Sequence, residues 1–187
     1  LHLDPLDGTF NAISGIPFYA LSIYIRGEDC RLGYIYDLAR GQRFYAEAGR
    51  GAYAGSGERM SVSENDDIKN FSISAYTIRP NAGRITGIGN RVRRIRTLGS
   101  ASLEMALVAS GRLDAFVDLR GMMRVVDVAA GCLIIEEAGG RVDIRSDSEG
   151  NQYGVCVFPD GSECDEWAYY RGECQPAPQQ AAPIPQG

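Results

Sequence analysis

The sequence predicts an α/β (α+β) protein with two different sheet-forming parts. Residues 17–54 are rich in β-branched and aromatic side chains and are interrupted by glycine turns, which is typical of an antiparallel or mixed meander. After residue 83, strand-like and helix-like segments alternate, as they do in α/β units. Residues 79–83 (Arg-Pro-Asn-Ala-Gly) interrupt both patterns, so we predict a domain boundary near residue 80.

The first domain, residues 1–80, is predicted to be mainly strands. Residues 17–26 are too apolar for a half-exposed strand, so we expect this strand to be buried. Residues 26–29 form a turn that leads into the next strand. The remaining strands are expected at 31–38, 42–46, 52–54 and 71–76.

The second domain, residues 81–175, is predicted to alternate strands with helices. Strands are expected at 92–97, 113–118, 141–144 and 154–158. Helices are expected at 100–110, 126–138 and 162–171. Residues 176–187 contain only Pro, Ala, Gln, Ile and Gly, so we expect a disordered tail there.

Composition restricts the partners and the chemistry. A formal net charge of −5 gives no basic field for a nucleic-acid backbone, so we expect no nucleic-acid partner. No apolar run approaches the ~20 residues that span a bilayer, so we expect no membrane partner either. The five cysteines form no CxxC pair, which favours reduced thiols in a cytoplasmic protein. The single histidine, His2, leaves almost no material for a serine–histidine mechanism.

One acidic loop combines the features that bind phosphate next to a metal ion. Asp4 and Asp7 are three residues apart and Pro5 stiffens the turn between them, so both carboxylates can converge on a hard cation such as Mg²⁺. Gly8 lets the backbone turn tightly and approach a ligand closely. A helix that begins near Thr9 would direct free N–H groups towards a bound anion.

Other interpretations of this loop differ in how well they fit. Asp, Gly and Thr are also ordinary turn and N-cap residues, so a capped turn stays an alternative. An EF-hand needs oxygen ligands at loop positions 1, 3 and 5 and a glutamate at position 12, which the residues from Phe10 onward do not supply. A haloacid-dehalogenase phosphatase needs Asp-x-Asp, one residue shorter than the spacing of Asp4 and Asp7.

Three blocks of sequence resemble the signatures of the inositol monophosphatase family. The first is Asp-Pro-Leu-Asp-Gly-Thr-Phe-Asn at 4–11, which continues with Gly-Ile-Pro-Phe-Tyr-Ala-Leu-Ser-Ile at 15–23. The second is Leu-Gly-Ser-Ala-Ser-Leu-Glu-Met-Ala at 98–106. The third runs from Val-Asp-Val-Ala-Ala-Gly to Glu-Glu-Ala-Gly-Gly within 126–140. The resemblance extends to about residue 160 and implies a two-domain αβαβα sandwich of the sugar-phosphatase type, with the site between the halves.

The resemblance also assigns roles to individual residues. Asp4, the Leu6 carbonyl, Asp7 and Asp127 would bind Mg²⁺. Asp4, Asp7 and Thr9 would be catalytic, and the Thr9 hydroxyl would help to orient the attacking water. The substrate-binding residues would be Asp7, Gly8, Thr9, Arg96, Gly99, Ser100, Ala101, Asp118 and Arg120. Taken alone, Asp127 could also be an acidic residue favoured at a helix N-terminus.

Two departures from the family pattern resemble its archaeal branch. Val126 occupies the position of the family's tryptophan, and residues 118–124 are longer than the corresponding stretch of the animal enzymes. Archaeal members also accept fructose 1,6-bisphosphate. The resemblance therefore implies hydrolysis of inositol 1-phosphate and/or fructose 1,6-bisphosphate by a metal-activated water. A nucleotide 3′-phosphatase, an NADP phosphatase and a non-catalytic regulatory relative are the alternatives.

The family resemblance also bears on completeness and assembly. The chain opens at Leu1, three residues before the first block, so we expect sequence upstream and a missing first helical layer. The family places a further glutamate and aspartate before the first block, and we therefore expect this polypeptide to be weakly active or inactive. A phosphorylated small molecule is the expected partner, and the resemblance implies a homodimer.

Overall fold

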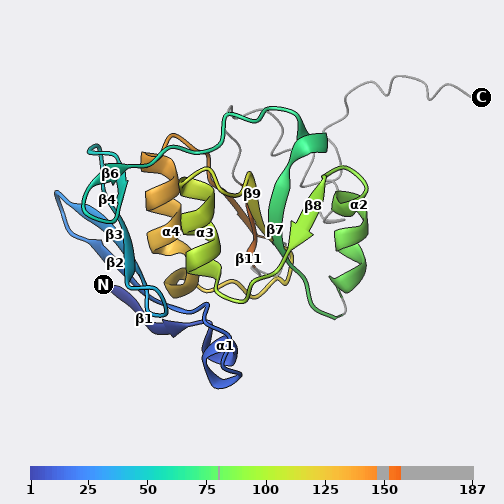
Figure 1. Cartoon of the computed structure of the whole chain (residues 1–187), viewed down its shortest axis with the longest axis horizontal. Coiled ribbons are helices and arrows are strands. Elements are labelled where there is room, and N and C mark those ends of the chain that lie inside the picture. Colours follow the sequence, from blue (N-terminus) through green and yellow to red (C-terminus); the bar gives the residue numbers. More distant parts are fainter. Residues whose placement is uncertain (80, 147–151, 157–187) are drawn as a thin grey trace, which may run out of the picture.

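Two β-sheets enclose a pair of helices in the computed structural model, which describes residues 1–79, 81–146 and 152–156 (Figure 1). A third helix, α2 (Ile85–Gly89), lies on the far side of the smaller sheet. The order of layers is therefore sheet, helices, sheet, helix, which confirms the predicted sandwich for the described part of the chain.

The larger sheet is an antiparallel meander in chain order. Its strands are β1 (His2–Asp7), β2 (Ala20–Arg26), β3 (Arg31–Asp37), β4 (Gln42–Glu47), β5 (Ala52–Ala54) and β6 (Glu58–Arg59). Helix α1 (Thr9–Ile13) lies between β1 and β2. The sequence predicted the meander but not β1, because Pro5 and two aspartates mask its alternating pattern.

One face of this sheet packs on the helices and the other is only partly covered. Ala20, Ser22 and Ile35 are buried, while Ile25 is 40% exposed. The prediction of a fully buried strand at 17–26 was therefore wrong. The apolar run reflects a strand whose second face also carries aliphatic side chains, and α3 and α4 pack on the first face.

The smaller sheet is parallel and has β7 (Ser72–Tyr76) at its centre, between β8 (Arg94–Arg96) and β9 (Ala115–Asp118). An antiparallel pair, β10 (Asp143–Ser146) and β11 (Gln152–Cys156), lies beside β9. The chain enters this sheet at β7. The change of sheet therefore comes before residue 80, the position near which we predicted a domain boundary. The segment between β6 and β7 connects the two sheets. The Asp114 carboxylate holds this segment because it accepts hydrogen bonds from the Ser63 hydroxyl and the Ser72 amide.

Helices α3 (Ala101–Ala109) and α4 (Val125–Glu137) form the middle layer. Eight of the nine residues of α3 are buried, as expected of a helix covered on all sides. Two glycines permit this close packing. A Cβ atom at Gly33 would lie 2.7 Å from the Ala130 carbonyl oxygen, and one at Gly131 would lie 2.7 Å from the Met105 sulfur.

We expect Gly33→Ala to destabilise the fold. The added methyl group would meet the backbone of α4 rather than a flexible side chain, so the helix would have to move away from the sheet. Overpacking of this kind costs about 1–3 kcal/mol, enough to lower the melting temperature by several degrees. Gly83→Ala is the matched control because nothing lies within 4 Å of its Cβ position. Equal melting temperatures for the two variants would contradict the prediction.

Some predicted elements lie outside the described residues. These are the helix at 162–171, the last two residues of the strand at 154–158 and the tail at 176–187. Helix α2 was not predicted, since Gly87 and Gly89 lower the helix propensity of its short segment. Within the described ranges, no helix has the length and apolarity needed to cross a membrane.

Candidate active site

The acidic loop is formed by the end of β1, which has an irregular register between Asp4 and Asp7. Asp4 Oδ1 accepts a hydrogen bond from the Leu6 amide (3.1 Å), and the Thr9 hydroxyl donates to the Leu6 carbonyl (2.8 Å). Gly8 adopts φ 86°, and a Cβ atom there would lie 3.0 Å from the Phe18 carbonyl oxygen. The loop is therefore closed by its own side chains and requires glycine at its turn.

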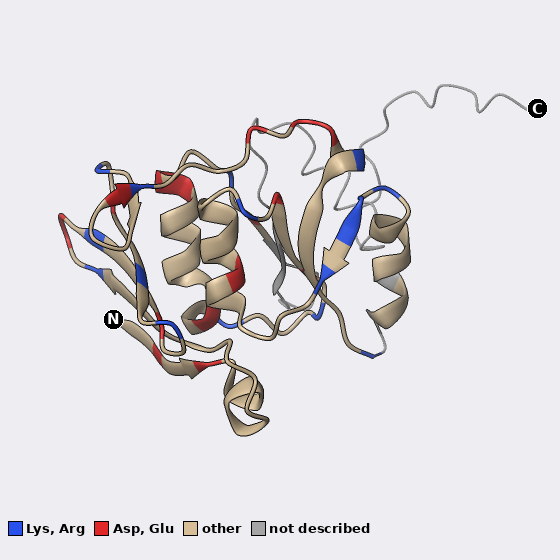
Figure 2. Ribbon diagram, viewed as in Figure 1, with Lys and Arg blue, Asp and Glu red and all other residues tan. Residues whose placement is uncertain are grey.

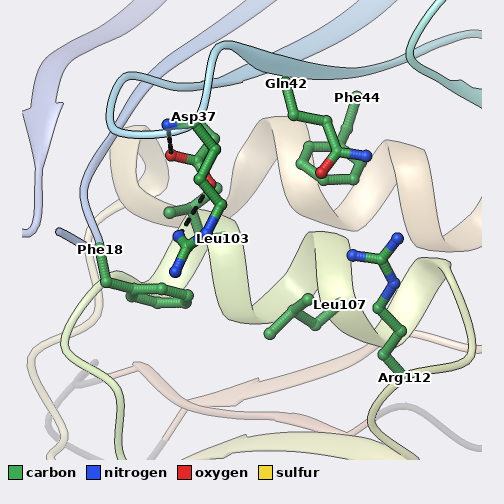
Figure 3. A pocket seen from close by; sticks show the side chains of 8 residues that line it. Phe18, Asp37, Gln42, Phe44, Leu103, Leu107 and Arg112 are labelled. Carbon is green, nitrogen blue, oxygen red and sulfur yellow. Dashed lines mark hydrogen bonds and ion pairs between the residues drawn. The ribbon is translucent and has the colours of Figure 1, made fainter.

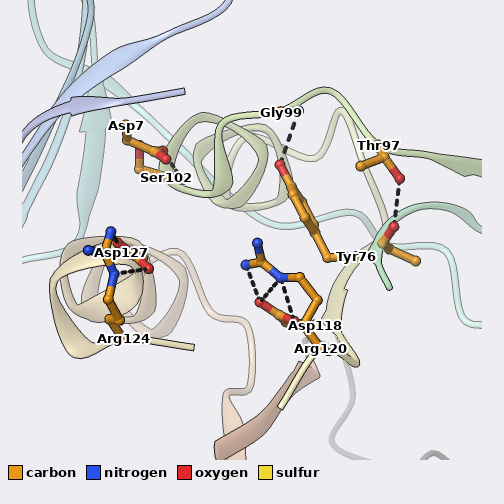
Figure 4. Close-up of polar contacts among 10 residues, drawn as sticks. Asp7, Tyr76, Thr97, Gly99, Ser102, Asp118, Arg120, Arg124 and Asp127 are labelled. Atoms are coloured by element: carbon orange, nitrogen blue, oxygen red, sulfur yellow. Dashed lines mark hydrogen bonds and ion pairs between the residues drawn. The ribbon is translucent and has the colours of Figure 1, made fainter. Parts of the chain in front are cut away.

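Asp7 connects this loop to the N-terminus of α3 (Figure 4). Its Oδ2 atom accepts hydrogen bonds from the Ser100 hydroxyl (2.7 Å), the Ser102 amide (2.8 Å) and the Ser102 hydroxyl. Ser100 occupies the N-cap position of α3 without a capping hydrogen bond from its own side chain. The carboxylate of Asp7, at the end of β1 in the larger sheet, therefore caps α3 and stabilises the positive end of the helix dipole.

Burial makes the charge of Asp7 unfavourable. Desolvation raises the pKa of its carboxyl group, and the nearby charge of Asp4 raises it further, although the hydrogen bonds from Ser102 and Ser100 oppose the shift. Two neighbouring carboxylates, of which Asp7 is partly buried, are stabilised by a positive charge placed between them. The chemistry of this donor set therefore fits a hard divalent cation.

Asp127 lies in the first turn of α4 and is paired with Arg124. The Arg124 Nη2 atom lies 2.7 Å from Asp127 Oδ1, and its Nε atom lies 3.1 Å from Oδ2. The side chain of Asp127 is 14% exposed and that of Arg124 is 70% exposed. Arg124 also lies within electrostatic range of Asp4 and Asp7, and it therefore supplies positive charge to all three carboxylates.

The three carboxylates belong to one region but do not form a closed cluster. Figure 2 shows acidic segments on β1, α3 and α4 around it, whereas β8 is basic. Over the residues that the structure describes, no three His, Cys, Asp or Glu side chains are grouped closely enough to hold a metal ion. A cation bound by Asp127 would have to displace the exposed Arg124 side chain from its carboxylate.

The loop before α3 is held by side chains from three elements. The Asn11 amide donates to the Leu98 carbonyl (2.7 Å) and to the Phe18 carbonyl (2.8 Å). The Gly99 amide donates to the Tyr76 hydroxyl (3.0 Å). The Leu98 amide donates to the buried Glu104. These bonds bring Gly99, Ser100 and Ala101, to which the family resemblance assigns substrate binding, beside Asp7 and Gly8.

Asp118 and Arg120 form a bonded pair at the end of β9. Arg120 donates to both oxygens of the Asp118 carboxylate, which is 1% exposed. The Arg120 guanidinium lies over the Tyr76 ring, with its central carbon 4.6 Å from the ring centroid. Asp118 therefore orients Arg120, and the arginine is the member of the pair with the more accessible side chain.

Arg96 lies within the smaller sheet, where it donates a hydrogen bond to the Ser72 hydroxyl.

The sequence patterns indicated no role for four residues of this region, Asn11, Tyr76, Glu104 and Arg124. Tyr76 ends the strand predicted at 71–76, and ligands of α/β sheets bind outside the carboxyl ends of parallel strands. This signal was hidden because we expected the strand in the first domain, whereas it lies in the parallel sheet. The contacts of Asn11 and Glu104 join separate segments, so no sequence pattern within one segment indicates them.

A pocket of about 240 Å³ lies apart from these residues, between the larger sheet and α3 (Figure 3). It is lined by Phe18, Asp37, Arg40, Gln42, Phe44, Leu103, Leu107 and Arg112. Asp37 is buried and its carboxylate accepts hydrogen bonds from the backbone and guanidinium of Arg40. The pocket contains none of the predicted site residues, so the candidate active site is defined by its polar contacts rather than by this cavity.

Solved structures with a similar fold place the chain in a class. An IMPase of Thermotoga maritima matches with a TM-score of 0.77 at 35% identity, over 91% of this chain and 67% of that one. SuhB of Mycobacterium tuberculosis matches with a TM-score of 0.76 at 32% identity, over 90% of this chain and 69% of that one. The architecture is therefore that of the inositol monophosphatase and SuhB proteins.

The chain belongs to the inositol monophosphatase family, whose family model matches residues 1–169. The fructose-1,6-bisphosphatase/inositol-1-monophosphatase of Methanothermobacter thermautotrophicus is 39% identical over 150 residues, which cover 75% of this chain and 53% of that protein. The Thermococcus kodakarensis protein of the same name is 40% identical over 154 residues, covering 82% and 57%. The chain spans about half the length of these curated relatives. The predicted resemblance to the archaeal branch of this phosphatase family is confirmed.

Proposed function

We propose that this chain carries the metal-binding and substrate-binding residues of a Mg²⁺-dependent phosphomonoesterase acting on inositol 1-phosphate and/or fructose 1,6-bisphosphate. The observation that carries the proposal is the bonding of Asp7 to the N-terminus of α3, since it joins the acidic loop to the predicted substrate loop. The names of the archaeal relatives support the choice of substrates. We also propose a cytoplasmic protein whose partner is a phosphorylated small molecule.

The proposed metal site uses Asp4, the Leu6 carbonyl, Asp7 and Asp127. When bound there, Mg²⁺ would polarise the phosphate ester and lower the pKa of a water molecule. Asp7 is already fixed by three donors through Oδ2, so its orientation does not depend on a ligand. Preorganisation of this kind lowers the cost of binding a cation and a phosphate.

Thr9 is suited to orient the attacking water. Its hydroxyl hydrogen is donated to the Leu6 carbonyl, so its oxygen presents lone pairs to the site. A water molecule next to Thr9 would therefore donate a hydrogen to it and direct its own lone pair elsewhere. Gly8 and Thr9 would bind the phosphate through their backbone N–H groups, and Arg120 would bind the hydroxyls or second phosphate of the ester.

A second substrate class has its own support. The bifunctional NADP phosphatase/NAD kinase of Methanococcus maripaludis is 35% identical over 170 residues, which cover 80% of this chain and 30% of that protein. NADP is also a phosphomonoester, and the same carboxylates and loop amides would serve its 2′-phosphate. The two substrate classes differ in what Arg120 and the loop at 98–101 must recognise.

We expect phosphate release by this chain to be slow, to require Mg²⁺ and to be abolished by Asp127→Asn. The assay compares inositol 1-phosphate, fructose 1,6-bisphosphate, adenosine 3′,5′-bisphosphate and NADP, each with Mg²⁺ and with EDTA. The order of rates identifies the substrate class. Release that persists in EDTA, or that Asp127→Asn leaves unchanged, would contradict the proposal. Binding of an ester with Mg²⁺ but without release would support the substrate site without supporting catalysis by this chain.

A further inference from the structure

Tyr76 lies between two groups of predicted substrate-binding residues that come from different segments. It ends β7, the central strand of the parallel sheet, and it is buried. Figure 4 shows its hydroxyl directed towards Gly99 and its ring beside the Arg120 guanidinium. One side chain therefore contacts both the loop before α3 and the arginine that follows β9.

The Tyr76 hydroxyl is part of a buried polar group that fixes the loop. It accepts the Gly99 amide hydrogen, and Glu104, which is 0% exposed, accepts the neighbouring Leu98 amide hydrogen. The hydroxyls of Tyr76 and Ser74 lie near Glu104. Among the described residues, the Glu104 Oε2 atom and the Ser74 hydroxyl have no hydrogen-bond partner. Burial and the charge of Glu104 raise the pKa of Tyr76, so its hydroxyl keeps its hydrogen and can donate it to Glu104.

The loop needs these anchors because it has no regular structure of its own. Gly99 adopts φ 97°, and a Cβ atom there would lie 2.6 Å from the Asn11 Nδ2 atom. Its backbone position is therefore set by the side chains of Asn11, Tyr76 and Glu104. Loss of one anchor would change the position of Gly99 without removing any group that faces a substrate.

The ring of Tyr76 has a second, separate contact. Arg120 lies 4.6 Å above it, while Phe116 packs at 5.6 Å between ring centroids. A guanidinium over an aromatic face is held by electrostatic attraction to the ring. With Asp118 on its edge and Tyr76 on its face, Arg120 is restricted to one plane.

We infer that Tyr76 is a positioning residue for the organic part of the phosphate ester, which acts through Gly99 and Arg120. The inference rests on the proposed function. The hydrogen bonds that hold Asp7 and Thr9 come from Ser100, Ser102 and Leu6, not from Tyr76. Tyr76 is thus not bonded to the groups proposed to bind phosphate, so we expect phosphate binding to depend on Tyr76 much less than binding of the rest of the ester does.

The test measures two affinities by calorimetry in the presence of Mg²⁺: that of inorganic phosphate and that of fructose 1,6-bisphosphate. Tyr76→Phe removes the hydroxyl and keeps the ring, and Tyr76→Leu removes both contacts. We expect Tyr76→Phe to weaken ester binding by about 10-fold, as for loss of a buried hydrogen bond, and Tyr76→Leu to weaken it further. The affinity for inorganic phosphate should stay within about 2-fold of that of the unaltered chain.

Tyr53→Phe is the matched control, because it removes a hydroxyl that donates to the Arg50 carbonyl away from the site. It should leave both affinities unchanged. Equal weakening of both ligands by Tyr76→Phe, complete loss of phosphate binding or no change in either affinity would each overturn the inference. Failure of the unaltered chain to bind either ligand with Mg²⁺ would instead contradict the proposed function, and this result is obtained before any substitution is made.

Discussion

Asp7→Asn is expected to weaken Mg²⁺ binding by about 100-fold or more, since removing even the outer partners of metal ligands costs about 10–100-fold. The substitution takes a negative charge from the proposed cation site and replaces one carboxylate oxygen by an NH₂ group of nearly the same size. Calorimetry with Mg²⁺ measures the effect directly. Asp66→Asn, at an exposed position outside the site, is the control and should bind Mg²⁺ like the unaltered chain.

The same substitution separates metal binding from folding. The amide oxygen of an asparagine can still accept hydrogen bonds from the Ser102 amide and the Ser100 hydroxyl, so α3 stays capped. Because burial and Asp4 raise the pKa of Asp7, a neutral side chain also relieves an unfavourable charge. In EDTA we therefore expect the melting temperature to be equal or higher. Unchanged Mg²⁺ affinity would contradict the metal assignment, and a lower melting temperature would show that capping needs the charge.

Glu104→Gln is expected to abolish a pH-dependent loss of stability. Burial raises the pKa of Glu104 from 4.5 to about 7, with a further contribution from the charge of Asp7, while the nearby hydroxyls of Tyr76 and Ser74 and the hydrogen bond from the Leu98 amide oppose the shift. The folded protein thus holds this proton more tightly than the unfolded chain does. Between about pH 4.5 and pH 7 the folded state binds more protons, so stability falls as pH rises through this window.

The size of this effect follows from the shift. At about 1.4 kcal/mol for each pKa unit, the ionised carboxylate lowers the free energy of unfolding by about 3 kcal/mol above pH 7. Glutamine resembles the protonated acid and keeps an acceptor for the Leu98 amide. Urea unfolding should therefore give similar stabilities near pH 5 and a more stable variant near pH 8. Glu64→Gln, at an exposed position, should follow the unaltered chain. Parallel pH profiles for Glu104→Gln and the unaltered chain would contradict the prediction.

The sandwich was predictable because its elements have strong local patterns. The meander strands alternate or run apolar between glycine turns, and α3 and α4 are long apolar segments. Helix α2 was missed because it is short and contains two glycines. The exposure of Ile25 could not be predicted, since an apolar strand has the same sequence whether or not its second face is covered.

The candidate site was predictable only where one segment carries the chemistry. Asp4, Asp7 and Thr9 share a loop whose spacing indicates a phosphate and cation site. The roles of Tyr76 and Asn11 depend on bonds to Gly99 and Leu98, which are 23 and 87 residues away along the chain. No local pattern encodes such a bond. The pairing of Asp127 with Arg124 is local, but the choice between that partner and a cation is not a property of the sequence pattern.

Asn11 has a consequence for how a substrate enters. Its amide bonds a carbonyl on each side of the boundary between the two sheets, and Asp7 bonds α3 across the same boundary. A hinge motion that opened one half from the other would break these bonds together. The two halves are therefore held in one relative position, and we expect a phosphate ester to diffuse into a site that is already shaped rather than to be clamped between moving domains.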